Sequence, residues 1–281
     1  MKMKNKSSKK GKALFWASFF GTICLVCLVY IGIYYVKQVG ANQRYEELQE
    51  LPTIPVVTNV EEQEGQKEAE LEEPVEVTEE TFDVDLSLRK VKQINFGELW
   101  NRNPHIYAWI EIPGTQVNYP VLQHPTDDAY YLDHTVDGVS GLPGSIYTES
   151  VHPKDFTATN TVLYGHNMKN DSMFGSLHDY ESQEFLDMNP YVYVYLPDRT
   201  IIYQIFAASR FSDAYLPDYC DYESEKGFLS YIEEIRTNAI SEDKELDVPF
   251  GSRILTLSTC IANDPTHRFL VEAVLIDEYE S

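Results

Sequence analysis

The chain has 281 residues and a formal net charge of −23 at pH 7, a length that allows one large domain or two small ones. So acidic a chain lacks the basic surface that contact with nucleic-acid phosphates requires, and no nucleic-acid partner is expected. Its four cysteines are too few for the disulfide framework of a small secreted domain. Cys24 and Cys27 lie in an apolar run without a neighbouring histidine or acid, which argues against a redox or zinc site there.

An uncharged apolar segment covers residues 13–36. As a helix, its 24 residues would be about 36 Å long, enough to cross a bilayer. Six lysines precede it and few basic residues follow closely, so the positive-inside rule places residues 1–12 in the cytoplasm and the remainder outside. The alternative is a cleaved secretory signal, but the apolar run is too long and no clear cleavage site follows it. We therefore expect a single-pass membrane protein with an uncleaved anchor.

Residues 37–88 have the composition of a tether. After a possible short helix over residues 42–51, the segment is rich in proline, valine and glutamate, and acidic residues crowd positions 61–85 around Lys67. Such a segment cannot bury enough apolar surface to fold alone and is extended by its own charge. We predict a disordered, acidic extracellular stalk.

Residues 89–281 have the composition of a folded domain, with many aromatic and β-branched residues. Several apolar runs alternate with period two and end at Gly, Pro, Asn or Asp, as strands do. The predicted strands cover residues 106–112, 115–121, 159–165, 191–196, 200–209, 253–259 and 269–276. Predicted helices are fewer and cover residues 95–102, 174–180, 182–188 and 224–239. This pattern indicates a mainly β domain, an antiparallel barrel or sandwich.

Cys260 lies at the end of a predicted strand, between two strand-like runs. A thiol fixed by a strand can face a cleft and act as a nucleophile if a base or a cation activates it. The alternative is a buried, unreactive cysteine, which on this residue alone is the commoner case. Ser258 and Thr259, the small polar residues before it, are candidate substrate-binding residues.

Seven histidines could supply the base. His166 directly follows an apolar strand and Gly165, a position like that of Cys260, and would reach the same rim if the two strands were neighbours. His267 is the rival because it follows Cys260 closely in sequence.

Arg268 begins the last predicted strand. If residues 261–267 connect the two strands as a hairpin, Arg268 returns beside Cys260, where its guanidinium could stabilise an oxyanion or bind a substrate carbonyl. The alternative is an arginine on an edge strand, paired with a surface acid. Nothing in the sequence resembles metal-ligand spacing or a nucleotide-binding loop, and no metal or cofactor is expected.

These residues lie in motifs that resemble those of the sortases, the membrane-anchored cysteine transpeptidases of Gram-positive bacteria. The segment TLSTC at 256–260 is similar to the family's cysteine motif, YGHNM at 164–168 to its histidine motif, and Arg268 follows in the next strand. Within the family the chain looks most like class B, through WIEIPGTQVNYPVLQ, YYLDH, GSIY and the helix inserted before the cysteine strand.

The resemblance implies an eight-stranded β-barrel with a few short helices and a two-step acyl transfer. Cys260 would attack a sorting signal of the L-P-x-T-G or N-P-x-T-G kind in a secreted protein and form a thioacyl-enzyme. His166 would act as general acid and base, and Arg268 would stabilise the oxyanion. The accepting amine would belong to lipid II, a peptidoglycan cross-bridge or a pilin lysine. Two alternatives remain open, a hydrolytic cysteine endopeptidase on the same fold and a non-catalytic module of wall or pilus assembly.

Overall fold

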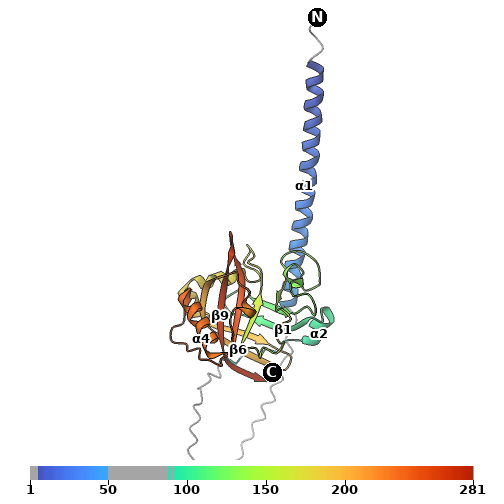
Figure 1. Ribbon diagram of the computed structural model, residues 1–281. Helices are drawn as coiled ribbons and strands as arrows, with labels where there is room; N and C mark the ends of the chain where they lie inside the picture. The colour runs from blue at the N-terminus through green and yellow to red at the C-terminus, as the bar shows by residue number, and fades with distance from the viewer. Residues whose placement is uncertain (1–5, 50–87, 90–91, 281) are drawn as a thin grey trace, which may run out of the picture.

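The computed structural model describes residues 6–49, 88–89 and 92–280, so most of the predicted stalk lies outside the described residues. Its first element is the helix α1 (Lys6–Gln49), which is long and apolar enough to cross a membrane. The helix does not end at residue 36, the predicted end of the anchor, but continues through residues 37–49 (Figure 1). The short helix expected over residues 42–51 is thus the end of α1, because neither a proline nor a capping turn interrupts the chain before it.

The domain that follows is built on one sheet of nine strands. They are β1 (Ile106–Glu111), β2 (Asn118–Leu122), β3 (Ile146–Tyr147), β4 (Asn160–Tyr164), β5 (Tyr191–Tyr195), β6 (Arg199–Ser212), β7 (Ala239–Glu242), β8 (Ile254–Ile261) and β9 (Asp264–Glu280). The order is β5-β1-β2-β3-β4-β8-β9-β6-β7, and a further pairing of β5 with β6 closes eight of the strands into a barrel, with β7 added outside it. The predicted mainly β, eight-stranded barrel is confirmed.

One helix of the domain precedes β1, and the others lie in the connections between strands. They are α2 (Phe96–Arg102), α3 (Gln183–Met188) and α4 (Glu225–Thr237), with the short 3-10 helices η2 (Tyr130–Leu132), η3 (Gly175–Glu181) and η4 (Leu216–Asp218). Ser224 caps α4 by accepting a hydrogen bond from the backbone of Gly227, which fixes where that helix begins. The helix predicted over residues 174–180 is the 3-10 helix η3.

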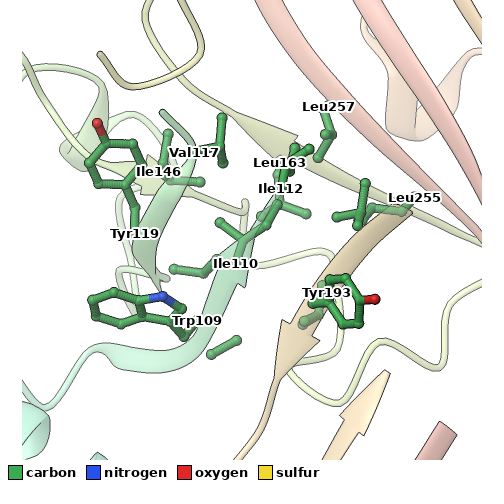
Figure 2. Close-up of a cluster of buried hydrophobic side chains, with 14 of the residues drawn as sticks. Trp109, Ile110, Ile112, Val117, Tyr119, Ile146, Leu163, Tyr193, Leu255 and Leu257 are labelled. Carbon is green, nitrogen blue, oxygen red and sulfur yellow. The ribbon is translucent and has the colours of Figure 1, made fainter. Parts of the chain in front are cut away.

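The barrel interior is filled by apolar side chains from opposite strands. Figure 2 shows Leu163 of β4 beside Leu257 of β8 and Ile112, and Ile146 of β3 beside Val117. Side chains alternate between the two faces of a strand, so the residues between these inner ones point outward. The same alternation that predicted the strands therefore also assigns their two faces.

The outer face of β4, β6, β8 and β9 is covered by α4. Phe228 and Ile235 of α4 pack in a second apolar cluster with Phe206 of β6 and Leu270 of β9, and Ile254 of β8 belongs to the same cluster. The apolar residues of α4 recur at spacings of three and four, which places them on one side of the helix. Because α4 buries the start of β8 on this face, only the end of the strand can be exposed there.

The last turns of α1 pack against the barrel. Ala41, Tyr45 and Leu48 are buried and recur at helical spacing, so one side of the helix faces the domain. The ring of Tyr45 meets that of Tyr119 of β2 edge-on, with centroids 5.6 Å apart. In Figure 1 α1 leaves the barrel on the side toward which the turn between β8 and β9 projects.

Candidate active site

Cys260 lies where the cover over the outer face of β8 ends. Ile254 packs with the α4 cluster, so by alternation Thr256, Ser258 and Cys260 face the same outer side. Ile254, Thr256 and Ser258 are buried. Cys260 is exposed, and its thiol is free. Cys260 thus lies near the end of a strand, as predicted, with an accessible thiol.

His166 reaches the same end of the barrel from the neighbouring strand. β4 and β8 pair in parallel up to the rung that joins Tyr164 to Ser258. His166 and Cys260 each follow that rung by two residues. The Thr259 hydroxyl donates a hydrogen bond to the Gly165 carbonyl at 2.8 Å, which continues the connection past the last rung. Two side chains far apart in sequence thus leave adjacent strand ends.

Gly165 is needed for space. Its φ does not lie in the left-handed region, and a Cβ built there would lie 2.6 Å from Ile146 Cδ1 and 2.7 Å from the Phe174 ring. Close packing against the apolar core therefore requires a glycine at this position.

The His166 ring is oriented by a backbone carbonyl. Its Nε2 lies 2.6 Å from the carbonyl oxygen of Leu132 in η2, and since a carbonyl only accepts, Nε2 carries the hydrogen and donates it. In the neutral ring this fixes the tautomer and leaves Nδ1 as the nitrogen that can accept a proton.

The backbone of the nucleophile is held by two side chains that sequence reasoning missed. Asn167 Nδ2 donates to the Cys260 carbonyl at 2.9 Å, and His178 Nε2 lies 2.9 Å from Asn167 Nδ2 and 3.1 Å from the Cys260 carbonyl oxygen. The His178 ring is fixed in turn, because its Nδ1 lies 2.8 Å from Glu181 Oε1 and it stacks on Phe269 of β9. Asn167 follows His166 in the histidine motif, and this position could have indicated a role for it. No feature of the sequence indicated a role for His178.

Arg268 lies directly opposite Cys260 in the antiparallel β8–β9 ladder, so the predicted hairpin is found. The register shifts between Cys260 and Ile261, and the turn passes through Asn263, whose φ is 62°. Arg268 Nη1 donates to the carbonyls of Pro265 and His267 at 3.1 and 3.0 Å. Within the described ranges it forms no ion pair, and β9 lies between β8 and β6, so Arg268 is not the edge-strand arginine of the alternative interpretation.

His267 is engaged away from the thiol, at the turn. Its Nδ1 lies 3.0 Å from Asp264 and 3.1 Å from the Thr266 hydroxyl. Hydrogen bonding by His267, and then by Thr266, lowers the pKa of Asp264 to about 2. This histidine belongs to the structure of the hairpin.

The two candidate substrate-binding residues are buried, Ser258 at 4% exposure and Thr259 at 2%. The Thr259 hydroxyl is used by Gly165, as described above. Buried side chains offer little surface to a bound peptide, so the assignment of these two residues to substrate binding stays a prediction.

A cluster of tyrosines and acids flanks the thiol. The rings of Tyr147 and Tyr164 stack with centroids 5.5 Å apart, and Tyr215 donates a hydrogen bond to Glu149 at 2.6 Å. Burial raises the pKa of Glu149, and burial, then Glu149 and the Cys260 thiol, raise the pKa of Tyr147. The segment GSIY contains Tyr147, but the sequence gave no reason to place it beside the thiol.

Cys220 lies in the connection before α4 and is a free, partly buried thiol. Burial raises its pKa, so the thiolate is disfavoured there. Because Cys260 is also free, the disulfide between them that would block the nucleophile is not formed.

A family model described as Sortase domain matches residues 110–276, more than half of the chain. Sortase B of Listeria monocytogenes is 30% identical over 164 residues, which are 58% of this chain and 65% of that protein. Sortase B of Staphylococcus aureus is 29% identical over 185 residues, 64% of this chain and 74% of that protein. The chain thus matches just under two thirds of the length of the Listeria relative.

Solved structures agree with these relatives. A Staphylococcus aureus sortase B–substrate complex has a TM-score of 0.58 at 29% identity, over 65% of this chain and 84% of that one. Sortase B of Clostridium perfringens has the same TM-score and identity over 65% of this chain and 100% of that one. The barrel and the matched domain define a fold of cysteine transpeptidases. The chain belongs to the sortase family, and it is most similar to the class B enzymes.

Proposed function

We propose that this protein cleaves the C-terminal sorting signal of secreted proteins through a thioacyl-enzyme and transfers them to an amine of the cell wall or of a pilin. The observation that carries the proposal is the arrangement of three side chains. Cys260 and His166 follow the same rung of two paired strands, and Arg268 lies across the ladder from the thiol.

In the first step the Cys260 sulfur attacks the threonine carbonyl of a signal of the L-P-x-T-G or N-P-x-T-G kind. A tetrahedral oxyanion forms, and Arg268 stabilises it through donors of its guanidinium. The peptide C–N bond then breaks, and His166 delivers to the leaving amine the proton that it took from the Cys260 thiol. The product is a thioester on Cys260 and a free C-terminal fragment.

In the second step an amine of lipid II, a peptidoglycan cross-bridge or a pilin lysine attacks the thioester. His166 accepts the proton that the amine loses, with Nδ1 as the accepting atom because Nε2 already donates to Leu132. A new amide bond forms and the Cys260 thiol is released. The same site with water as acceptor would be a hydrolase.

The proposed location follows from α1. The lysines before its apolar part favour the orientation with residues 1–12 in the cytoplasm and the barrel outside the membrane. The barrel would then lie on the side where secreted proteins meet wall precursors.

The test uses the full chain in lipid nanodiscs, incubated with sorting-signal pentapeptides of both kinds, with and without triglycine as the amine. Intact-mass spectrometry should find a thioacyl adduct on Cys260 and, with triglycine, a transfer product. Cys260→Ala should abolish both, whereas Cys220→Ala, the matched cysteine control, should keep both. Transfer by Cys260→Ala would overturn the assignment of the nucleophile. Release to water alone at saturating triglycine would make the protein an endopeptidase.

A further inference from the structure

The orientation of His166 depends on a glycine-rich loop that is held partly by its own hydrogen bonds and partly by α1. The Leu132 carbonyl that accepts from His166 lies at the start of the connection between η2 and β3. Three glycines of that connection, Gly138, Gly141 and Gly144, have positive φ values of 70°, 123° and 68°. Glycine-rich backbone has many accessible conformations, so other contacts must select this one.

Tyr45 of α1 makes those contacts. Its hydroxyl donates a hydrogen bond to the Gly144 carbonyl at 2.6 Å and accepts one from the Val136 backbone at 3.1 Å. The Ser145 hydroxyl lies 3.0 Å from the same oxygen. One side chain thus joins the two limbs of the loop, and its own exposure is only 3%.

From Gly144 the connection to the histidine is direct. A Cβ on Gly144 would lie 2.6 Å from the Leu132 carbonyl oxygen and 3.1 Å from His166 Cδ2. The Gly144 backbone is therefore packed against both partners of the hydrogen bond that orients the ring. Because close-packed atoms transmit displacements, a shift of Gly144 moves that hydrogen bond.

The other contacts of α1 with this loop are weaker. Arg44 reaches Asp137 at 3.4 Å on the surface, and Asp137 is already paired with Arg102 at 2.7 Å. Exposed ion pairs of this kind contribute little. The buried hydroxyl of Tyr45 is thus the contact through which α1 sets the loop.

We infer that Tyr45 is a positioning residue for His166, so that the docked end of the anchor helix is a working part of the active site. The inference rests on the proposed function, in which His166 transfers protons. Tyr45 itself lies in another element and acts only through Gly144 and Leu132.

The experiment uses Tyr45→Phe in the full chain in nanodiscs, which removes the hydroxyl and keeps the ring. Tyr180→Phe is the matched control, because it removes an equally short bond from a buried tyrosine to a carbonyl, that of Asn189 at 2.7 Å. The first readout is the pH dependence of Cys260 alkylation by iodoacetamide, measured with Cys220 replaced by alanine in every variant. It needs no substrate and reports the influence of His166 on the thiol.

Tyr45→Phe should shift the alkylation profile toward that of His166→Ala and should have no further effect when His166 is already alanine. It should lower kcat for transfer about tenfold, with KM for the donor peptide within about twofold of the unsubstituted value. Tyr180→Phe should change neither.

An equal effect of Tyr45→Phe with and without His166, or an effect no larger than that of Tyr180→Phe, would overturn the inference. So would a change confined to KM. If the unsubstituted chain transferred nothing while the alkylation coupling persisted, the proposed function would fail and the link between Tyr45 and His166 would stand.

Discussion

Arg268 faces Cys260 across the β8–β9 ladder, and its guanidinium rests on the backbone of its own hairpin through Nη1. The strand pairing fixes the backbone of both residues. The guanidinium can therefore meet an oxyanion formed at the thiol without a change in the sheet.

Arg268→Lys should lower kcat/KM for transfer by about 100-fold, the cost of losing one oxyanion donor. A lysine keeps the charge but lacks the planar fork and would not make both carbonyl contacts in the same geometry. Steady-state kinetics with a sorting-signal peptide measure the change. Wild-type kinetics in the lysine variant would leave Arg268 with a purely structural role.

His166→Ala and His267→Ala should differ strongly. The first removes the proposed acid and base, at a cost of about 100- to 10,000-fold in kcat. The second removes contacts with Asp264 and Thr266 at the turn and should cost less than about tenfold, mainly through the hairpin. Steady-state kinetics of the two variants measure this difference. A larger loss of kcat in His267→Ala than in His166→Ala would make His267 the base.

His178→Ala should slow transfer, although the His178 side chain does not contact the substrate in the proposed mechanism. It removes the ring that stacks on Phe269 and whose Nε2 lies 3.1 Å from the Cys260 carbonyl oxygen. We expect kcat to fall by about tenfold, the equivalent of one lost hydrogen bond of roughly 1.4 kcal/mol. Glutamine at the same position, which can still donate, should restore part of the rate. An equal loss in both variants would mean that the ring packing matters and the hydrogen bond does not.

Glu272 should give the protein a pH-dependent stability. It is fully buried on β9 under α4, and burial raises its pKa from 4.5 to about 7. Tyr231 donates to one carboxyl oxygen and Thr256 lies 2.8 Å from the other and 2.9 Å from Asn160 Oδ1. The Thr256 hydroxyl has one hydrogen to donate. If a protonated Glu272 donates its own hydrogen to this hydroxyl, the Thr256 hydrogen is left for Asn160.

Since the folded chain keeps this proton where the unfolded chain releases it, the free energy of unfolding should fall as the pH rises from about 4.5 and level off above about 7. Glu272→Gln, which imitates the protonated group, should remove this slope and be more stable than the unsubstituted chain at pH 8 by on the order of 2 kcal/mol. Thermal unfolding of both chains between pH 5 and pH 8 measures it. An equal difference in stability between the two chains at pH 5 and at pH 8 would show that Glu272 is ionised in the folded chain throughout this range.

The longer elements could be predicted from sequence because their apolar patterns extend over many residues. β6 and β9 contain long apolar runs whose residues are buried almost continuously, and α4 shows apolar residues on one side. β3, with Ile146 and Tyr147 alone, is too short to carry a period. The extension of α1 past residue 36 was missed because the change from apolar to polar composition suggested a boundary, although Tyr45 and Leu48 still repeat at helical spacing.

For the site, side-chain motifs indicated Cys260, His166 and Arg268, and the structure brings them to one end of adjacent strands. The sequence could not indicate His178, because its partner is a backbone carbonyl, and every residue has one. Tyr45 was hidden for a second reason. Its partner Gly144 lies 99 residues away, and only the folded chain brings them together.

The parallel pairing of β4 with β8 also has a consequence for how the protein is made. Thr259 and Gly165 are 94 residues apart in the chain, and contacts between such distant segments form late in folding because closing the intervening loop costs entropy. A growing chain that already contains the histidine can pair β4 with β3 alone until β8 has been synthesised. The thiol therefore meets its histidine only in a barrel that is nearly complete, and no partly synthesised chain can carry the activity.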